Sequence, residues 1–193
     1  MTPGAYRWPR PEVEAGGELV AIDGTWGANA EASSVDRGTE EGRLRLMGLW
    51  FGPSWGGLAD PAAALAAACA WHDSAWDALP YGKPDPSGAA ARRPPRELLD
   101  LSLDAAIISS DFLRFYAIDL SSPAHAGMCW HEFVSLLMCL TRAEGSLVRQ
   151  AVSARSYDGS ARGAARERAE ALLGAWALPP SDAELAEAAR RAF

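Results

Sequence analysis

The segment from Leu98 to Leu140 constrains the fold most, because it contains two apolar helical patterns joined by a short polar stretch. The apolar stripe of the first pattern runs through Leu101, Ile108, Phe112 and either Phe115 or Tyr116. The second pattern follows one helix face with i, i+3, i+4, i+7 and i+8 spacing, at Trp130, Phe133, Val134, Leu137 and Met138. Ser122 can cap the second helix, with Pro123 in its first turn. The segment therefore predicts two core-facing helices joined by a turn near residues 118–123.

The sequence before this pair predicts a small hairpin followed by helices. Extended runs at residues 13–15 and 18–22 flank Gly16-Gly17, which tolerates the positive φ angles of a tight turn, so we expect a β-hairpin. Residues 23–34 are polar and irregular and predict no regular element. Helical patterns follow at residues 35–51 and 61–78, and Asp60-Pro61 supplies an N-cap and a first-turn proline for the second of them.

The chain is expected to form one mainly helical domain over residues 13–180, with the hairpin at its amino end. Residues 1–12 predict an extended segment, and the proline-rich stretch at 80–96 predicts a loop or linker. After the central pair we expect a short helical turn at residues 147–152. A charged amphipathic helix should follow at 161–177, with its inner side formed by Ala165, Ala169, Leu172, Leu173 and Trp176. Ser181 and Glu184 form a capping box for a short last helix at 181–193.

The charge of the chain excludes several classes of partner. The 25 acidic residues outnumber the 18 basic ones and give a net charge of -7, which repels nucleic acid and anionic membranes. The arginines at 92, 93 and 96 stand among prolines and indicate a solvated linker. No signal pattern and no run of about 20 apolar residues is present. We therefore expect a cytoplasmic protein that binds neither nucleic acid nor membranes.

The three cysteines do not indicate a disulfide framework. Cys129 and Cys139 would lie about 15 Å apart along one helix, too far to bridge. Cys69 lies in an alanine-rich helical pattern. All three are expected to be small buried hydrophobic residues in a reducing compartment.

A search for reactive side chains predicts no catalytic, metal or cofactor site. His72 and His131 each precede an acidic residue, but adjacent residues on a helix point about 100° apart. His131 is expected at a helix surface, and a small hydrolase that uses His72 or His131 is the least favoured function. Asp104 and Asp111 share one helix face, where a solvated or hydrogen-bonded pair beside Arg114 is the simpler interpretation.

The 8 tryptophans are many for a chain of 193 residues. Several fall in weakly patterned or alanine-rich segments, and a fraction of them can serve as exposed anchors for another protein. The candidate protein-binding residues are Trp50, Phe51, Trp55, Trp71 and Trp76. For any single one of them, burial in the core is the simpler interpretation.

The central pair also carries a sequence signature, in which Tyr116-Ala117-Ile118-Asp119-Leu120 is followed by Trp130, Glu132-Phe133 and Leu136-Leu137. These residues resemble the bacteriophage protein family known as gene product fifteen, with alanine where that family has glycine. The resemblance is specific over residues 104–140 and weakest over 31–57. We interpret the signature residues as structural rather than as a binding site. They are Asp104, Tyr116, Ile118, Asp119, Leu120, Trp130 and Phe133.

The resemblance further implies a tail assembly chaperone of long-tailed phages or prophages. A tape-measure protein is long, helical and apolar, and would aggregate before tube subunits surround it. A small acidic helical protein could bind its amphipathic helices and keep them in solution. The expected partners are the tape-measure protein and other tail proteins, with possible self-association, in the host cytoplasm and not in the mature virion. A structural subunit of the neck or tail is the alternative.

Overall fold

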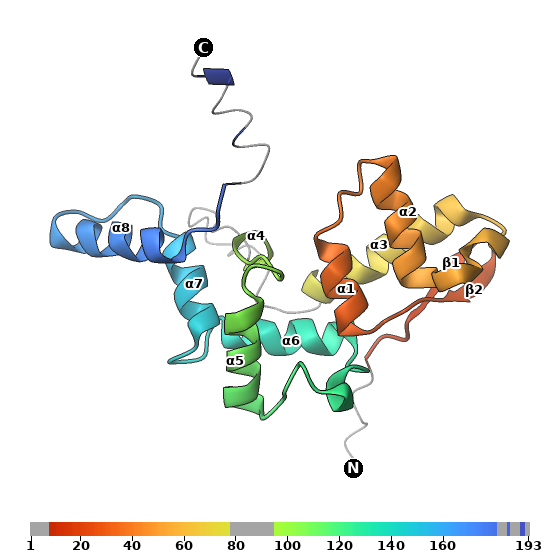
Figure 1. Ribbon diagram of the computed structural model, residues 1–193, viewed down its shortest axis with the longest axis horizontal. Coiled ribbons are helices and arrows are strands. Elements are labelled where there is room, and N and C mark those ends of the chain that lie inside the picture. The colour runs from red at the N-terminus through yellow and green to blue at the C-terminus, as the bar shows by residue number, and fades with distance from the viewer. Residues whose placement is uncertain (1–7, 78–94, 181–184, 186–189, 192–193) are drawn as a thin grey trace.

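The computed structural model describes residues 8–77, 95–180, 185 and 190–191 and is mainly helical, with a two-stranded hairpin at its amino end (Figure 1). This architecture confirms the predicted fold class. Most of the proline-rich stretch at 80–96 and most of the predicted last helix at 181–193 lie outside the described residues. Within the described ranges, no helix is long and apolar enough to cross a membrane.

The hairpin pairs β1 (Glu12–Ala15) with β2 (Glu18–Ala21) in antiparallel register, with Val13 opposite Val20. Gly16 and Gly17 form the turn with φ angles of +62° and +85°, which L side chains rarely adopt. Alternate residues of β1 are buried against the body, so the strand has one inner face. The predicted hairpin is confirmed.

The next two helices differ from the prediction. Residues 23–34, predicted as irregular, contain α1 (Trp26–Ser33). The predicted helix at 35–51 begins later, as α2 (Glu40–Phe51), where Thr39 Oγ1 accepts the N–H of Gly42 at 3.0 Å. A Cβ at position 42 would lie 1.9 Å from the backbone oxygen of Asp36, so only glycine fits there. A 3₁₀ turn, η1 (Gly52–Gly57), follows.

The alanine-rich helix α3 (Pro61–Asp77) begins as predicted, with Asp60 Oδ1 accepting the N–H of Ala63 at 2.9 Å. It contributes side chains to two hydrophobic cores. The amino-terminal core lies between the hairpin, α1, α2 and the first part of α3, and contains Leu46, Trp50, Ala64 and Ala68 among others. The carboxy-terminal core receives Ala75 from the end of the same helix. Small side chains let both cores approach α3 closely.

The carboxy-terminal core is built around the predicted helix pair, α5 (Ala105–Tyr116) and α6 (Trp130–Leu140). The prediction that Ser122 caps α6 is wrong. Ser122 accepts the N–H of Ala124 and caps a separate 3₁₀ turn, η2 (Pro123–His125). Instead α6 follows Cys129, whose backbone pairs with Thr25 in an isolated bridge that holds the amino-terminal segment beside it.

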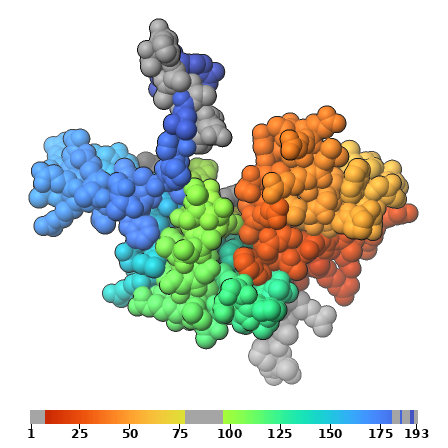
Figure 2. Space-filling view, in the orientation of Figure 1, coloured from red at the N-terminus to blue at the C-terminus, as the bar shows by residue number. Residues whose placement is uncertain are grey.

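Three helices complete the fold: α4 (Pro95–Leu98), α7 (Leu147–Arg155) and α8 (Ala164–Trp176). The helix α7 is longer than the predicted turn and buries Val148 and Ala151 in or beside the carboxy-terminal core. The helix α8 projects from the edge of the body (Figure 2), and all of its residues are exposed or half-buried. Its predicted inner side is therefore only partly correct, because Ala165 and Leu172 are exposed.

Candidate functional site

The signature residues of α6 lie at the junction of the two cores. The indole Nε1 of Trp130 donates to the backbone oxygen of His72 on α3 at 2.9 Å. Phe133 stacks between Trp26 and Phe112, with ring centroids 5.3 Å and 5.1 Å away. These rings join α1, α3, α5 and α6, which is a structural role.

The signature residues at the end of α5 fix the turn that leaves this helix. The hydroxyl of Tyr116 donates to the backbone oxygen of Leu136 at 2.9 Å, and burial raises the pKa of Tyr116 to about 12. Ile118 is half-buried and Leu120 is buried. Asp119 is exposed, and its Oδ1 accepts the hydroxyl and the N–H of Ser121, which lowers the pKa of Asp119.

The two aspartates predicted to share a solvated or hydrogen-bonded face are both buried and have separate partners. Asp104 forms a bidentate ion pair with Arg155 of α7, at 2.7 Å and 2.8 Å. Asp111 Oδ2 accepts the hydroxyl of Ser146 at 2.7 Å and the N–H of Val148 at 2.9 Å, at the start of α7. Both carboxylates therefore connect α7 to the segment that contains α5. They are hydrogen-bonded and not solvated.

The predicted aromatic binding surface is mostly absent from the surface that the structure describes. Trp50 and Phe51 are buried in the amino-terminal core, and Trp71 and Trp76 are half-buried. Trp55 in η1 is 36% exposed. The large apolar side chains with exposed fractions above that of Trp55 are leucines, and none of them was among the predicted binding residues: Leu19, Leu44, Leu103, Leu113, Leu172 and Leu185.

The three cysteines differ in burial, whereas all three were predicted to be buried. Cys69 and Cys129 are half-buried, whereas Cys139 at the end of α6 is exposed. The apolar stripe of α6 leaves position 139 on its outer face, which explains the exposure of this thiol.

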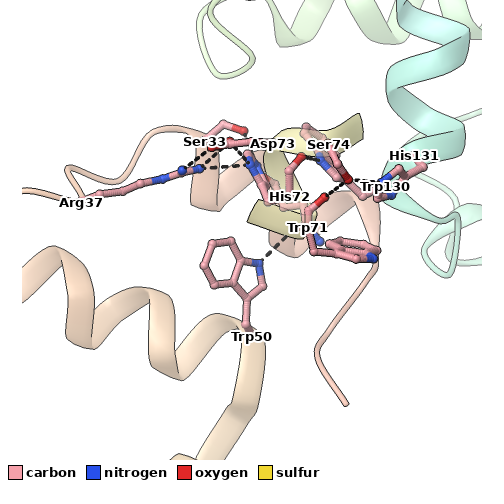
Figure 3. A network of polar contacts seen from close by, with 10 residues as sticks. Ser33, Arg37, Trp50, Trp71, His72, Asp73, Ser74, Trp130 and His131 are labelled. Carbon is pink, nitrogen blue, oxygen red and sulfur yellow. Dashed lines mark hydrogen bonds and ion pairs between the residues drawn. The ribbon is translucent and has the colours of Figure 1, made fainter. Parts of the chain in front are cut away.

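A cluster of polar side chains occupies the place where α1, α3 and the segment between α1 and α2 meet (Figure 3). Ser33 Oγ lies 3.1 Å from His72 Nε2, and His72 Nδ1 lies 3.0 Å from Asp73 Oδ1. The same order of groups forms the catalytic triad of serine hydrolases, where the histidine takes the proton of the serine. Sequence spacing did not suggest this arrangement, because Ser33 is far from His72 in the chain.

The partners of His72 favour a structural role for this cluster. His72 Nε2 lies 3.1 Å from the backbone oxygen of Asn29, and Arg37 Nη2 lies 3.0 Å from His72 Nδ1. A carbonyl can only accept and a guanidinium can only donate, so these two contacts favour a neutral ring with its proton on Nε2. The carboxylate of Asp73, 3.0 Å from Nδ1, can only accept and favours the other tautomer. A general base for Ser33 would need the proton on Nδ1. Burial lowers the pKa of His72 from 6.5, so the ring is neutral at pH 7.

Ser33 is also placed unfavourably for acyl chemistry. It is the last residue of α1, and its Oγ donates to the backbone oxygen of Asn29 at 2.9 Å. The end of a helix presents carbonyl oxygens, so an oxyanion formed there would be destabilised. The adjoining cavity measures about 130 Å³, below the roughly 300 Å³ at which ligand sites begin. The cluster therefore holds α1 on α3.

The second histidine of interest, His131, is buried at 2% exposure, so the prediction of a surface position is wrong. Its Nε2 lies 3.0 Å from Ser74 Oγ, and its ring meets the edge of Trp71 with centroids 4.5 Å apart. Burial lowers the pKa of His131. Within the described residues, no group of three or more metal-ligating side chains could hold an ion.

A groove of about 860 Å³ lies between α7 and α8. The side formed by α7 and the residues next to it has four small residues, Gly145, Ser146, Ser153 and Ala154, and four larger ones, Glu144, Arg149, Gln150 and Tyr157. Ala169 and Leu172 line its α8 side, and Leu172 is 53% exposed. Small side chains allow another backbone to approach closely, so this groove is the surface best suited to receive a polypeptide.

Comparison with protein-family models, curated proteins and solved structures finds no match to this chain. The resemblance of residues 104–140 to the gene product fifteen family therefore stays a prediction based on those residues alone.

Proposed function

We propose that the protein is a non-catalytic tail assembly chaperone of a long-tailed phage or prophage, which binds the tape-measure protein and keeps it soluble during tail morphogenesis. The observation that carries this proposal is the groove between α7 and α8, beside a helix whose residues are all exposed or half-buried. The class of partner comes from the resemblance of the signature residues, and the place of binding comes from the groove.

The shape of the groove supports an amphipathic helix as the bound element. Its volume of about 860 Å³ lies within the range of ligand sites, which is about 300–1,000 Å³. Its small residues let a helix lie close to α7. Leu172 offers an apolar contact that leaves water when a helix binds. Full burial of an exposed leucine contributes about 1.5–3 kcal/mol. Leu172 is 53% exposed, so its burial contributes about half of that, which suits reversible binding that tube subunits later displace.

The charge of the chain supports the same role. A net charge of -7 keeps the protein soluble and limits its self-association. A complex with an apolar helical segment therefore stays in solution while the apolar face of that segment is covered. The cluster around His72 supports binding over hydrolysis, because Ser33 donates its proton to the backbone oxygen of Asn29 and lies at a helix end, which opposes its activation.

The test is co-expression of the chain with the tape-measure protein of the same phage genome. Three forms are compared: the unaltered protein, Leu172→Glu in the groove, and Leu44→Glu on α2 as a control. Leu44 is 50% exposed against 53% for Leu172, so both substitutions charge a similar leucine. Circular dichroism verifies that each variant is folded.

We expect soluble tape-measure protein with the unaltered chain and with Leu44→Glu, and a pellet with Leu172→Glu. An unchanged pellet with the unaltered chain would overturn the proposed function. Equal solubility with all three forms would support the proposed function but would show that the groove is not the binding site. Mass spectrometry of purified virions separates the alternative, because a neck or tail subunit is retained in the particle and a chaperone is not.

A further inference from the structure

The carboxylate of Asp73 lies within reach of two competing side chains. Arg37 Nη1 contacts Asp73 Oδ2 at 2.8 Å, and Arg37 Nη2 contacts Oδ1 at 3.1 Å. His72 Nδ1 lies 3.0 Å from the same Oδ1. Arg37 Nη2 is also 3.0 Å from His72 Nδ1, so three groups meet at one point. The ring of His72 is fully buried, whereas Arg37 and Asp73 are about one-third exposed.

We propose that a proton taken up by His72 moves Asp73 Oδ1 from Arg37 to His72 and so loosens the segment of residues 34–39, which carries Arg37, on α3. The arrangement is thus a proton-driven exchange of partners at the junction of α1, α2 and α3.

The exchange follows from the hydrogen bonds of the two protonation states. In the neutral tautomer with its proton on Nε2, His72 Nδ1 accepts from Arg37, and Nε2–H donates to the backbone oxygen of Asn29. When water delivers a proton to Nδ1, that atom becomes a donor that faces a guanidinium donor at 3.0 Å. The new N–H can instead donate to Asp73 Oδ1 at its present distance of 3.0 Å. Arg37 then loses its contacts with His72 Nδ1 and with Oδ1, and it is held on α3 by the contact of Nη1 with Asp73 Oδ2 at 2.8 Å.

The rest of the His72 environment is compatible with both states. The bond to Asn29 remains in each, and the ring stacks on Trp130 with centroids 4.9 Å apart, which also suits a cation. Ser33 from α1 and Trp50 from α2 bring no charge to the ring. Only the side that faces Arg37 must rearrange.

Several titratable or charged groups of the described residues face His72 or its partners. Asp73 favours the protonated ring, whereas Arg37 and His131 of α6 oppose it. Cys69, one turn earlier on α3, interacts with Arg37 and Asp73. Burial is the largest cause that lowers the pKa of His72, so the exchange belongs to pH values below 6.5.

Amide hydrogen exchange of residues 34–39, followed from pH 7.5 to 5.0 and corrected for the intrinsic rate, tests the proposal. Val35 N–H donates to the oxygen of Ala32, and Thr39 N–H donates to that of Asp36, so protection of this segment is measurable. We expect protection to fall by up to about tenfold per pH unit below 6.5, the limit for uptake of one proton. His72→Gln should remove this dependence.

A second variant keeps the proposal testable where His72→Gln does not fold. Arg37→Gln should expose residues 34–39 already at pH 7.5, and should move the NMR titration of the His72 ring to higher pH by removing a nearby cation. Arg45→Gln, which breaks an exposed pair with Glu31 at 2.7 Å, is the matched control and should change neither readout. Protection of residues 34–39 that is independent of pH, or lost only together with the whole fold, would overturn the exchange. An unmoved His72 titration in Arg37→Gln would do the same.

Discussion

Replacement of Arg155 by methionine is the sharpest test of how the carboxy-terminal core is held together. The side chains of Arg155 and Asp104 are 9% and 6% exposed. Besides its bidentate pair with Asp104, the guanidinium donates to the backbone oxygens of Leu98 at 2.8 Å and Trp176 at 2.6 Å. One side chain therefore joins α7 to the end of α4, to the residue before α5 and to the end of α8.

The expected cost of Arg155→Met is about 4 kcal/mol of unfolding free energy. Loss of one partner from a buried ion pair costs about 3–5 kcal/mol, because the other charge is left uncompensated. The two carbonyl oxygens also lose a donor, although water can reach the end of α8. With a urea dependence of about 2 kcal/mol per molar, the unfolding midpoint should fall by about 2 M.

Urea unfolding followed by tryptophan fluorescence measures this loss. Asp104→Asn in the Arg155→Met background should recover part of the stability, because it removes the unpaired charge. Arg166→Met is the control, since Arg166 forms an exposed pair with Glu170 at 2.7 Å, and its midpoint should be unchanged. A loss below about 1 kcal/mol in Arg155→Met would refute the view that this pair is buried and essential.

Three further predictions concern single contacts and pH. Ala117 has a left-handed φ of 54° at the end of α5, so Ala117→Gly should raise the thermal unfolding midpoint and stabilise the fold by about 1 kcal/mol. Tyr116→Phe removes the bond to Leu136 and should cost about 1 kcal/mol in urea unfolding. Burial lowers the pKa of both His72 and His131, so the unfolded chain binds protons first as the pH falls below 6.5. Urea midpoints at pH 7.5 and 5.5 should therefore show stability lost on acidification, by at most about 1.4 kcal/mol per pH unit for each histidine, and His72→Gln should reduce this slope.

The elements that sequence predicts correctly are those with local signals. Gly16-Gly17 marks the hairpin turn, Asp60-Pro61 marks the start of α3, and apolar periodicity marks α5 and α6. Each of these signals acts within a few residues of the chain, by fixing a turn, satisfying a free N–H or forming one apolar face.

The features that sequence did not predict depend on distant partners. The helix α1 has almost no amphipathic pattern, and its buried Asn29 is satisfied by Trp50 Nε1, which donates to its side-chain oxygen at 3.0 Å. His131 is buried because Trp71 and Ser74 from α3 cover it. No local pattern around Arg155 reveals that its partner is Asp104, because the pair is formed across the fold.

The contacts of Arg155 connect the signature segment to the proposed binding groove. Asp104 orients the guanidinium, the guanidinium holds the carbonyl of Trp176, and Trp176 ends the helix that forms one side of the groove. Every residue of α8 is exposed or half-buried, so no buried side chain of its own fixes this helix on the body. A signature residue can therefore support binding without touching the bound helix. By this reasoning Arg155→Met should impair the proposed binding by displacing α8, whereas Leu172→Glu should impair it while the stability of the fold is kept.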